Sequence, residues 1–179
     1  MDIGNFLLIR LTDDYDFKPF DCKDDDLNQF LLDDSKDFAK SLIAVTYLLE
    51  SENHTVAFFS LLNDKISAED FASNRKWQSF RKDAISPTKR FRSYPAVKIG
   101  RLAISHEFKA NNIGTAILDY IKELFVDNNR TGCKFITVDA YEQSLGFYEK
   151  NGFKYFTDED KGKDTRAMYF DLLPYAGSN

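Results

Sequence analysis

The chain has 179 residues, a mass of 20.7 kDa and a net charge of −5, and 43% of its residues are hydrophobic. These values are typical of one globular domain (residues 1–179) with a sizeable core. No apolar run approaches the roughly 20 residues of a membrane-spanning helix, and the acidic N-terminus does not resemble a signal peptide. Cys22 and Cys133 have neither metal-ligand nor redox spacing. We therefore expect a cytoplasmic protein in a reducing compartment, with no metal and no membrane partner.

Charge is unevenly distributed along the chain. Residues 1–40 contain eleven aspartates and five basic residues (net −6), whereas residues 75–92 contain seven basic residues and one acid (net +6). We interpret the acidic segment as a solvated surface. Trp77, Phe80 and Phe91 lie between the basic residues. A phosphate-bearing ligand is therefore an alternative to a solvated surface for the basic segment.

The first half of the chain predicts two β-rich regions around a helix. FLLIRL (residues 6–11) is typical of a strand, and Asp24–Asp26 offer N-caps for a helix with Leu27, Phe30 and Leu31 on its apolar face. Residues 42–50 and 55–63 predict a hairpin. Residues 68–95 then predict an insertion, with a helix at about 69–82 and a basic loop after it.

The second half alternates strands and helices. The pattern predicts a strand at 97–105, a helix beginning near Ile113, a strand at 134–140, a helix at 142–151 closed by Gly152, and a final hairpin. We expect an α/β (α+β) fold: a mixed, mostly antiparallel seven-stranded sheet flanked by helices on both faces. Residues 97–140 should form a right-handed crossover.

The turn Lys109–Gly114 (KANNIG) lies between a predicted strand and a predicted helix. Free backbone N–H groups and the helix dipole form an anion site at such a place. Gly114 allows a phosphate to approach, and Asn112 can either cap the helix or adopt a left-handed conformation. The turn matches neither GxGxxG nor the GK[ST] of a P-loop, so it does not indicate a dinucleotide or a nucleoside triphosphate.

Together with FYEKNGF (Phe147–Phe153), this turn resembles the GNAT superfamily of acyl-CoA-dependent N-acetyltransferases. The family's phosphate loop is written [RQ]xxGx[GA]; here Lys109 replaces Arg/Gln and Asn112 replaces the first glycine, while Gly114 keeps the second. GRLA followed by DAxxxxxxFYxxxGF is similar to the branch that includes toxins of toxin–antitoxin pairs. Members of that branch acetylate the amino group of aminoacyl-tRNA, and Tyr141 agrees with it. The acidic pI of about 5.1 does not favour a nucleic-acid partner.

The resemblance implies an acetyl-CoA-dependent N-acetyltransferase in which the amine attacks the thioester directly. Its coenzyme-binding residues would be Leu102, Ala103 and Ile104 for the pantetheine arm, and Lys109, Ala110, Asn111, Asn112, Ile113, Gly114 and Thr115 for the pyrophosphate. Tyr148, in the FYEKNGF motif, would protonate the CoA thiolate.

The sequence leaves the base, the acceptor and the oligomeric state open. His106 and Asp139 are candidate bases, although a structural or solvated role fits each of them, and water can also take the proton. The acceptor is a small amine, a protein amine or aminoacyl-tRNA, and the protein is a monomer or a homodimer. The alternative function is a catalytically degenerate GNAT domain that binds CoA or a partner. Asn112 favours this alternative, and Tyr148 favours the enzyme.

Overall fold

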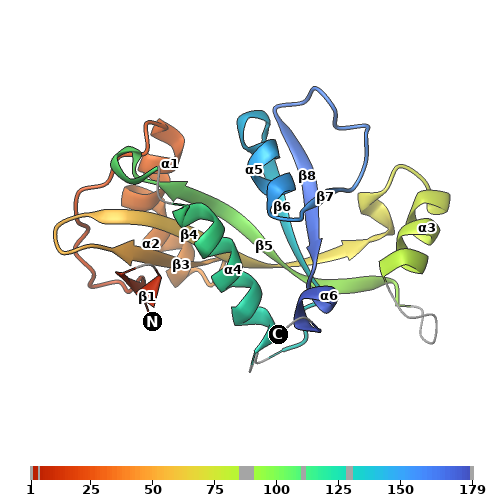
Figure 1. The fold of residues 1–179 in the computed structure, drawn as a ribbon, viewed down its shortest axis with the longest axis horizontal. Coiled ribbons are helices and arrows are strands. Elements are labelled where there is room, and N and C mark those ends of the chain that lie inside the picture. The colour runs from red at the N-terminus through yellow and green to blue at the C-terminus, as the bar shows by residue number, and fades with distance from the viewer. Residues whose placement is uncertain (1, 4, 85–90, 110–111, 128–130, 178–179) are drawn as a thin grey trace. The chain divides into compact units, whose positions relative to one another are not determined.

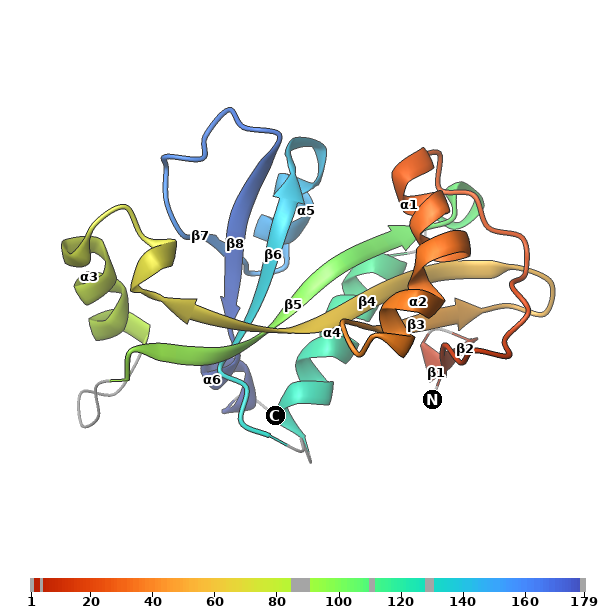
Figure 2. The same ribbon diagram turned by 180° about the vertical axis from the view of Figure 1, so that it is seen from behind.

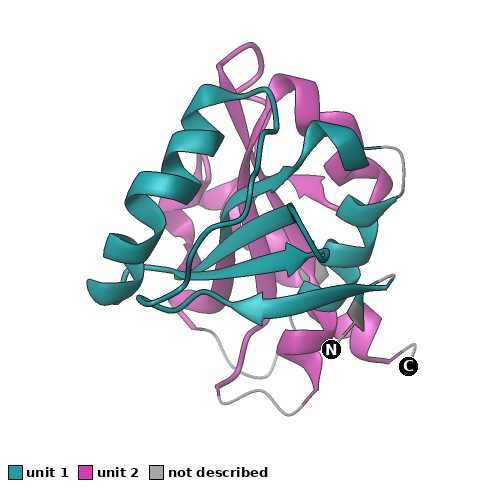
Figure 3. Ribbon diagram, turned by 90° about the vertical axis from the view of Figure 1, so that its left-hand side faces the viewer, with its two compact units in different colours: residues 1–63, 99–121 teal, residues 64–98, 122–179 magenta. Residues whose placement is uncertain are grey.

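The computed structural model describes residues 2–3, 5–84, 91–109, 112–127 and 131–177 (Figure 1). Two compact units are present: unit 1 comprises residues 1–63 and 99–121, and unit 2 comprises residues 64–98 and 122–179 (Figure 3). Two long strands and one helix each contribute residues to both units, namely β4 (Thr55–Ser67), β5 (Ser93–Ile104) and α4 (Ile113–Val126). The fold class is mixed α/β, as the sequence predicts.

The strands of unit 1 follow the order β1-β2-β3-β4-β5. The remaining elements of this unit are β1 (Asp2–Ile3), β2 (Phe6–Arg10), α1 (Asp25–Gln29), the π-helical turn η1 (Phe30–Asp34), α2 (Ser35–Lys40), β3 (Val45–Glu50) and the 3-10 turn η3 (His106–Phe108). The pairs β1–β2, β2–β3 and β3–β4 are antiparallel. The sheet has eight strands among the described residues, one more than predicted, since the short β1 pairs with β2.

Helices cover both faces of the unit 1 strands, and two adjacent phenylalanines on β4 show why. Phe58 packs against Phe30 of η1 with 6.1 Å between ring centroids, whereas Phe59 packs against Tyr120 of α4 at the same separation. Successive side chains of a strand point to opposite faces. Figures 1 and 2 accordingly show α2 and α4 on opposite sides of these strands.

The predicted N-terminal helix forms, but a wider turn interrupts it. Asp24 caps α1 by accepting a hydrogen bond from the Leu27 backbone at 3.2 Å. The hydroxyl of Ser35, the first residue of α2, donates to the carbonyl of Leu31 in η1, a local bond that competes with regular helix geometry. The next strand begins at Val45 rather than at residue 42, because Leu42 (φ 57°) closes α2 in a left-handed conformation.

Strands of unit 2 follow the order β5-β6-β8-β7. Its further elements are the 3-10 turn η2 (Ala68–Asp70), α3 (Asn74–Ala84), β6 (Phe135–Tyr141), the 3-10 turn η4 (Glu142–Ser144), α5 (Leu145–Lys150), β7 (Lys154–Tyr155), β8 (Thr165–Asp171) and α6 (Leu172–Ala176). Strand β8 pairs antiparallel with both β6 and β7, which confirms the predicted terminal hairpin.

An aromatic cluster anchors the insertion to the core of unit 2. Trp77 and Phe80 of α3 are 4% and 8% exposed and pack with Phe71, Tyr94 and Phe135. Two of the aromatic residues in the basic segment are therefore core residues rather than ligand-contacting ones, and Phe91 alone of the three is exposed. None of the described helices has both the length and the apolar character needed to cross a membrane.

Candidate active site

The predicted coenzyme segment begins at the end of β5, in unit 1. Ala103 is buried in the core cluster that contains Phe30 and Phe58, whereas Leu102 and Ile104 are half-buried. Because neighbouring strand residues alternate between faces, Ala103 fixes the strand to the core while Leu102 and Ile104 line the other face. The backbone N–H of Ser105 then donates to Val56 of β4 at 2.8 Å.

Asn112 adopts the left-handed conformation (φ 53°) at the start of α4. Its carbonyl accepts the first helical hydrogen bond, from the N–H of Ala116 at 3.1 Å. In the first turn of α4, Gly114 is buried and Thr115 is exposed. The first N–H groups of a helix have no acceptor within the helix, which makes a helix start suited to an anion. The predicted coenzyme residues Ala110 and Asn111 lie outside the described residues.

Lys109 and His106 attach the turn to the loop before α1. The Lys109 ammonium donates to the carbonyl of Cys22 at 3.1 Å, and the His106 ring Nδ1 lies 3.0 Å from the carbonyl of Asp21. The backbone N–H of His106 also donates to this carbonyl, at 2.9 Å. Two contacts to one carbonyl indicate a structural role for His106. Lys109 is exposed, and its bond to Cys22 uses one of the three hydrogens of an ammonium group.

Tyr148 lies on α5 in unit 2 and is 6% exposed. Its ring contacts Phe147 and Phe153 edge-on, with centroids 5.1 and 5.2 Å away. Burial raises the pKa of the Tyr148 phenol, because a phenolate would lose its hydration in this aromatic surrounding. The side chain therefore stays protonated and can act as a hydrogen-bond or proton donor.

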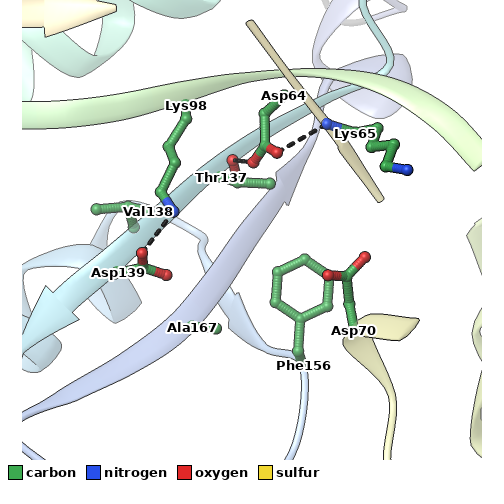
Figure 4. Close-up of a pocket in the computed structure, with 9 residues that line it drawn as sticks. All are labelled: Asp64, Lys65, Asp70, Lys98, Thr137, Val138, Asp139, Phe156 and Ala167. Carbon is green, nitrogen blue, oxygen red and sulfur yellow. Dashed lines mark hydrogen bonds and ion pairs between the residues drawn. The ribbon is translucent and has the colours of Figure 1, made fainter. Parts of the chain in front are cut away.

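Asp139 lies on β6 at the wall of a cavity of about 180 Å³ in unit 2 (Figure 4). Its carboxylate forms an ion pair with Lys98 of β5 at 2.5 Å. Asp64 of β4 accepts a hydrogen bond from the hydroxyl of Thr137, also at 2.5 Å. Asp139 was predicted from the sequence as a candidate base, whereas Asp64, Lys98 and Thr137 were not. No local motif marks them, since 34 or more residues separate each segment from the next.

Comparison with known proteins identifies the family. Residues 51–169 match the acetyltransferase (GNAT) domain family. The chain belongs to the GNAT acetyltransferase family. No protein of curated function matches it.

Solved structures similar to this GNAT protein include toxins. A tyrosine-to-phenylalanine mutant of KacT has 19% identity and a TM-score of 0.76, covering 97% of this chain and 98% of that one. AtaTR bound with acetyl-CoA has 22% identity and a TM-score of 0.75, with coverages of 97% and 96%. AtaT complexed with acetyl-methionyl-tRNAfMet has 21% identity and a TM-score of 0.74, with coverages of 95% and 96%. At these identities the similarity establishes the fold.

Asn112, at the place where the GNAT pattern has its first glycine, has a left-handed backbone. Asparagine is among the few residues other than glycine that enter the left-handed region readily. The replacement thus alters the side chain at this position while leaving a left-handed residue immediately before α4.

Among the described residues no three His, Cys, Asp or Glu side chains gather as a metal site.

Proposed function

We propose that this GNAT protein transfers an acetyl group from acetyl-CoA to an amine, with Tyr148 as the general acid. The observation that carries the proposal is a phenol that is 6% exposed, kept protonated by burial, and located within the family motif FYEKNGF.

Leu102, Ala103 and Ile104 hold the pantetheine arm in this proposal, and residues 109–115 hold the pyrophosphate. The helix dipole and free N–H groups at the start of α4 attract the phosphates. Lys109 adds a positive charge, and the left-handed Asn112 supports coenzyme binding rather than degeneracy. One backbone N–H of residues 102–104 polarises the thioester carbonyl, a contribution of roughly 10²–10³ in rate.

Bonds and protons balance in the proposed reaction. The neutral amine nitrogen attacks the thioester carbon, the C–S bond breaks, and the amine loses one proton while the CoA sulfur gains one from Tyr148. Burial raises the pKa of Tyr148, and the same apolar surroundings raise the pKa of a thiolate expelled beside it. Both pKa values rise, but the phenol remains the weaker acid, so its proton moves to the sulfur only as negative charge develops there during C–S cleavage. The proton lost by the amine restores the phenol through solvent.

A substitution at Tyr148 tests the proposal directly. Tyr148→Phe should lower kcat by about 10²-fold or more at saturating acetyl-CoA, since general acid catalysis contributes about 10²–10⁴. The dissociation constant of acetyl-CoA, measured by calorimetry, should stay unchanged. Thiol release is monitored over a panel of amines. Tyr47→Phe is the matched control, since Tyr47 of β3 stacks on Phe59 in unit 1 and phenylalanine keeps that contact. Turnover by Tyr148→Phe at the wild-type rate would refute the role of Tyr148.

Aminoacyl-tRNA is the acceptor that the similar structures favour, because AtaT was solved with acetyl-methionyl-tRNAfMet. A toxin function within a toxin–antitoxin pair accompanies this choice, as AtaT was also solved bound to the C-terminus of the antitoxin AtaR. Incubation with labelled acetyl-CoA and a cell extract, followed by mass spectrometry, identifies the acceptor. Label on protein amines or small amines alone would exclude aminoacyl-tRNA.

A further inference from the structure

The cavity of unit 2 is lined by strands β4, β5, β6 and β8, by the turn η2 and by the segment immediately after β7. Its volume of about 180 Å³ is below the roughly 300–1,000 Å³ of pockets for drug-sized ligands, so it admits only a small group. Figure 4 shows the side chains of Asp64, Asp70 and Asp139 around this space, with the ring of Phe156 between them. Polar groups on several sides and an aromatic wall are typical of a small-ligand site.

Neighbouring groups hold each of the three carboxylates. Asp64 is bound at both oxygens: the hydroxyl of Thr137, a residue 5% exposed, donates to Oδ2, and the backbone N–H of Lys65 donates to Oδ1 at 2.8 Å. Lys98 binds Oδ2 of Asp139. The backbone of Ser67 donates to Oδ2 of Asp70 at 2.6 Å. Such bonds fix the orientation of the carboxylates before a ligand arrives, which lowers the entropic cost of binding.

The charge facing the cavity is negative. Three carboxylates and the Lys98 ammonium surround the space, whereas the Lys65 ammonium points away from it in Figure 4. A cationic ligand is therefore favoured over an anionic or neutral one. Phe156 offers a π-face to an ammonium and an apolar surface to the alkyl chain that carries it. These features select a primary alkylammonium.

We propose that this cavity binds the primary ammonium group of the acceptor, with Asp64 and Asp139 as the specificity-determining carboxylates. The inference rests on the proposed function, because an N-acetyltransferase must collect its acceptor as a protonated amine. Both a lysine side chain and the α-amino group of an aminoacyl ester present this chemistry. The two sources differ in the group that carries the ammonium: a flexible alkyl chain in the first and a carbon bonded to an ester carbonyl in the second.

Binding of n-butylammonium to the full chain, measured by NMR titration, tests the inference without any turnover. We expect saturable binding that n-butanol, its neutral counterpart, does not reproduce. Asp64→Asn and Asp139→Asn should each raise the dissociation constant at least about fivefold, because each removes a charge-assisted hydrogen bond. Asp33→Asn is the control, since Asp33 is an exposed carboxylate of η1 in unit 1. Thermal unfolding checks that every variant is folded.

Two further probes separate the sources of the ammonium. Nα-acetyl-lysine amide presents only the side-chain ammonium, and norleucine methyl ester only the α-ammonium. The probe whose affinity falls at least about fivefold for both asparagine variants identifies the natural source of the ammonium group. Equal affinity of wild type and variants for every probe, or no binding of n-butylammonium by the wild type, would overturn the inference.

Turnover then separates the two proposals. If amines are acetylated and the asparagine variants keep the wild-type KM, the proposed function stands and the cavity is not the acceptor site. If n-butylammonium binds as expected but no amine is acetylated, the cation site stands and the proposed function fails. A rise in KM for the amine with an unchanged dissociation constant for acetyl-CoA supports both.

Discussion

The two units differ in how they build left-handed turns. Among the described residues, the non-glycine residues with positive φ, Asn5, Lys23, Leu42 and Asn112, all lie in unit 1. The glycines with positive φ, Gly152 and Gly162, both lie in unit 2. The two halves of the family pattern show the same division, since the coenzyme turn replaces a glycine by Asn112 whereas FYEKNGF keeps Gly152.

Local surroundings explain this difference. A Cβ atom at Gly152 would lie 3.0 Å from the ring of Phe170, and the φ of 87° adds strain for any side chain. Asn112 is exposed, and its residue type tolerates a positive φ. Replacement of a glycine in a family motif therefore indicates a changed backbone only where neighbouring side chains leave no room for a Cβ atom.

Among the substitutions that test this comparison, Gly152→Ala is expected to have the largest effect on stability. It should lower the free energy of unfolding by about 2 kcal/mol, because a left-handed backbone and a tight Cβ contact act together. Gly146→Ala is the matched control on α5, where a Cβ would meet no atom within 4 Å. That change should raise stability by up to about 1 kcal/mol. Chemical denaturation measures both, and equal effects would remove the distinction between these glycines.

Substitutions at Asn112 come next. Asn112→Gly should leave the dissociation constant of acetyl-CoA within about twofold, since glycine adopts a positive φ freely. Asn112→Val should raise it about tenfold, because a β-branched residue costs about 1–2 kcal/mol in the left-handed region. Calorimetric titration compares the two variants. If valine bound the coenzyme as well as glycine does, the conformation of residue 112 would be irrelevant to the turn.

Leu42→Gly tests a left-handed position at which a side chain other than glycine has no evident benefit. Leu42 is 92% exposed and ends α2 in a Schellman motif, with Ile43 N–H bonded to the Phe38 carbonyl at 2.9 Å. Glycine should raise the free energy of unfolding by up to about 1 kcal/mol, because it relieves the strain. Ser41→Gly, at a φ of −79°, should give no gain. A loss of stability in Leu42→Gly would show that the leucine side chain stabilises the fold.

The last test is confined to alkaline pH and concerns the half-buried thiol of Cys133 in unit 2. Burial raises the pKa of Cys133 to about 11, whereas the thiol of an unfolded chain ionises near pH 9. The folded state therefore holds more protons than the unfolded state between these values, and stability should fall as the pH rises from about 9 to about 11. Cys133→Ala should make this decline shallower in denaturation curves. An identical pH dependence in the variant would contradict the raised pKa.

Most of the elements were predictable from local patterns. Hydrophobic periodicity and capping residues located the helices and strands, since they depend on neighbours a few residues apart. Motif spacing singled out the coenzyme turn and Tyr148, whose roles stay predictions. Family membership was inferred from the same residues and is confirmed by the match over residues 51–169.

Only the tertiary structure decided three features of the molecule. It buried Trp77 and Phe80, which the sequence places among basic residues, and it gave Asn112 a left-handed backbone. It also brought Asp64, Lys98 and Asp139 to one cavity from strands β4, β5 and β6. Such contacts depend on strand pairing between segments far apart in the chain. Their free energy is set by burial and by which charges face each other, and neither can be read from adjacent residues.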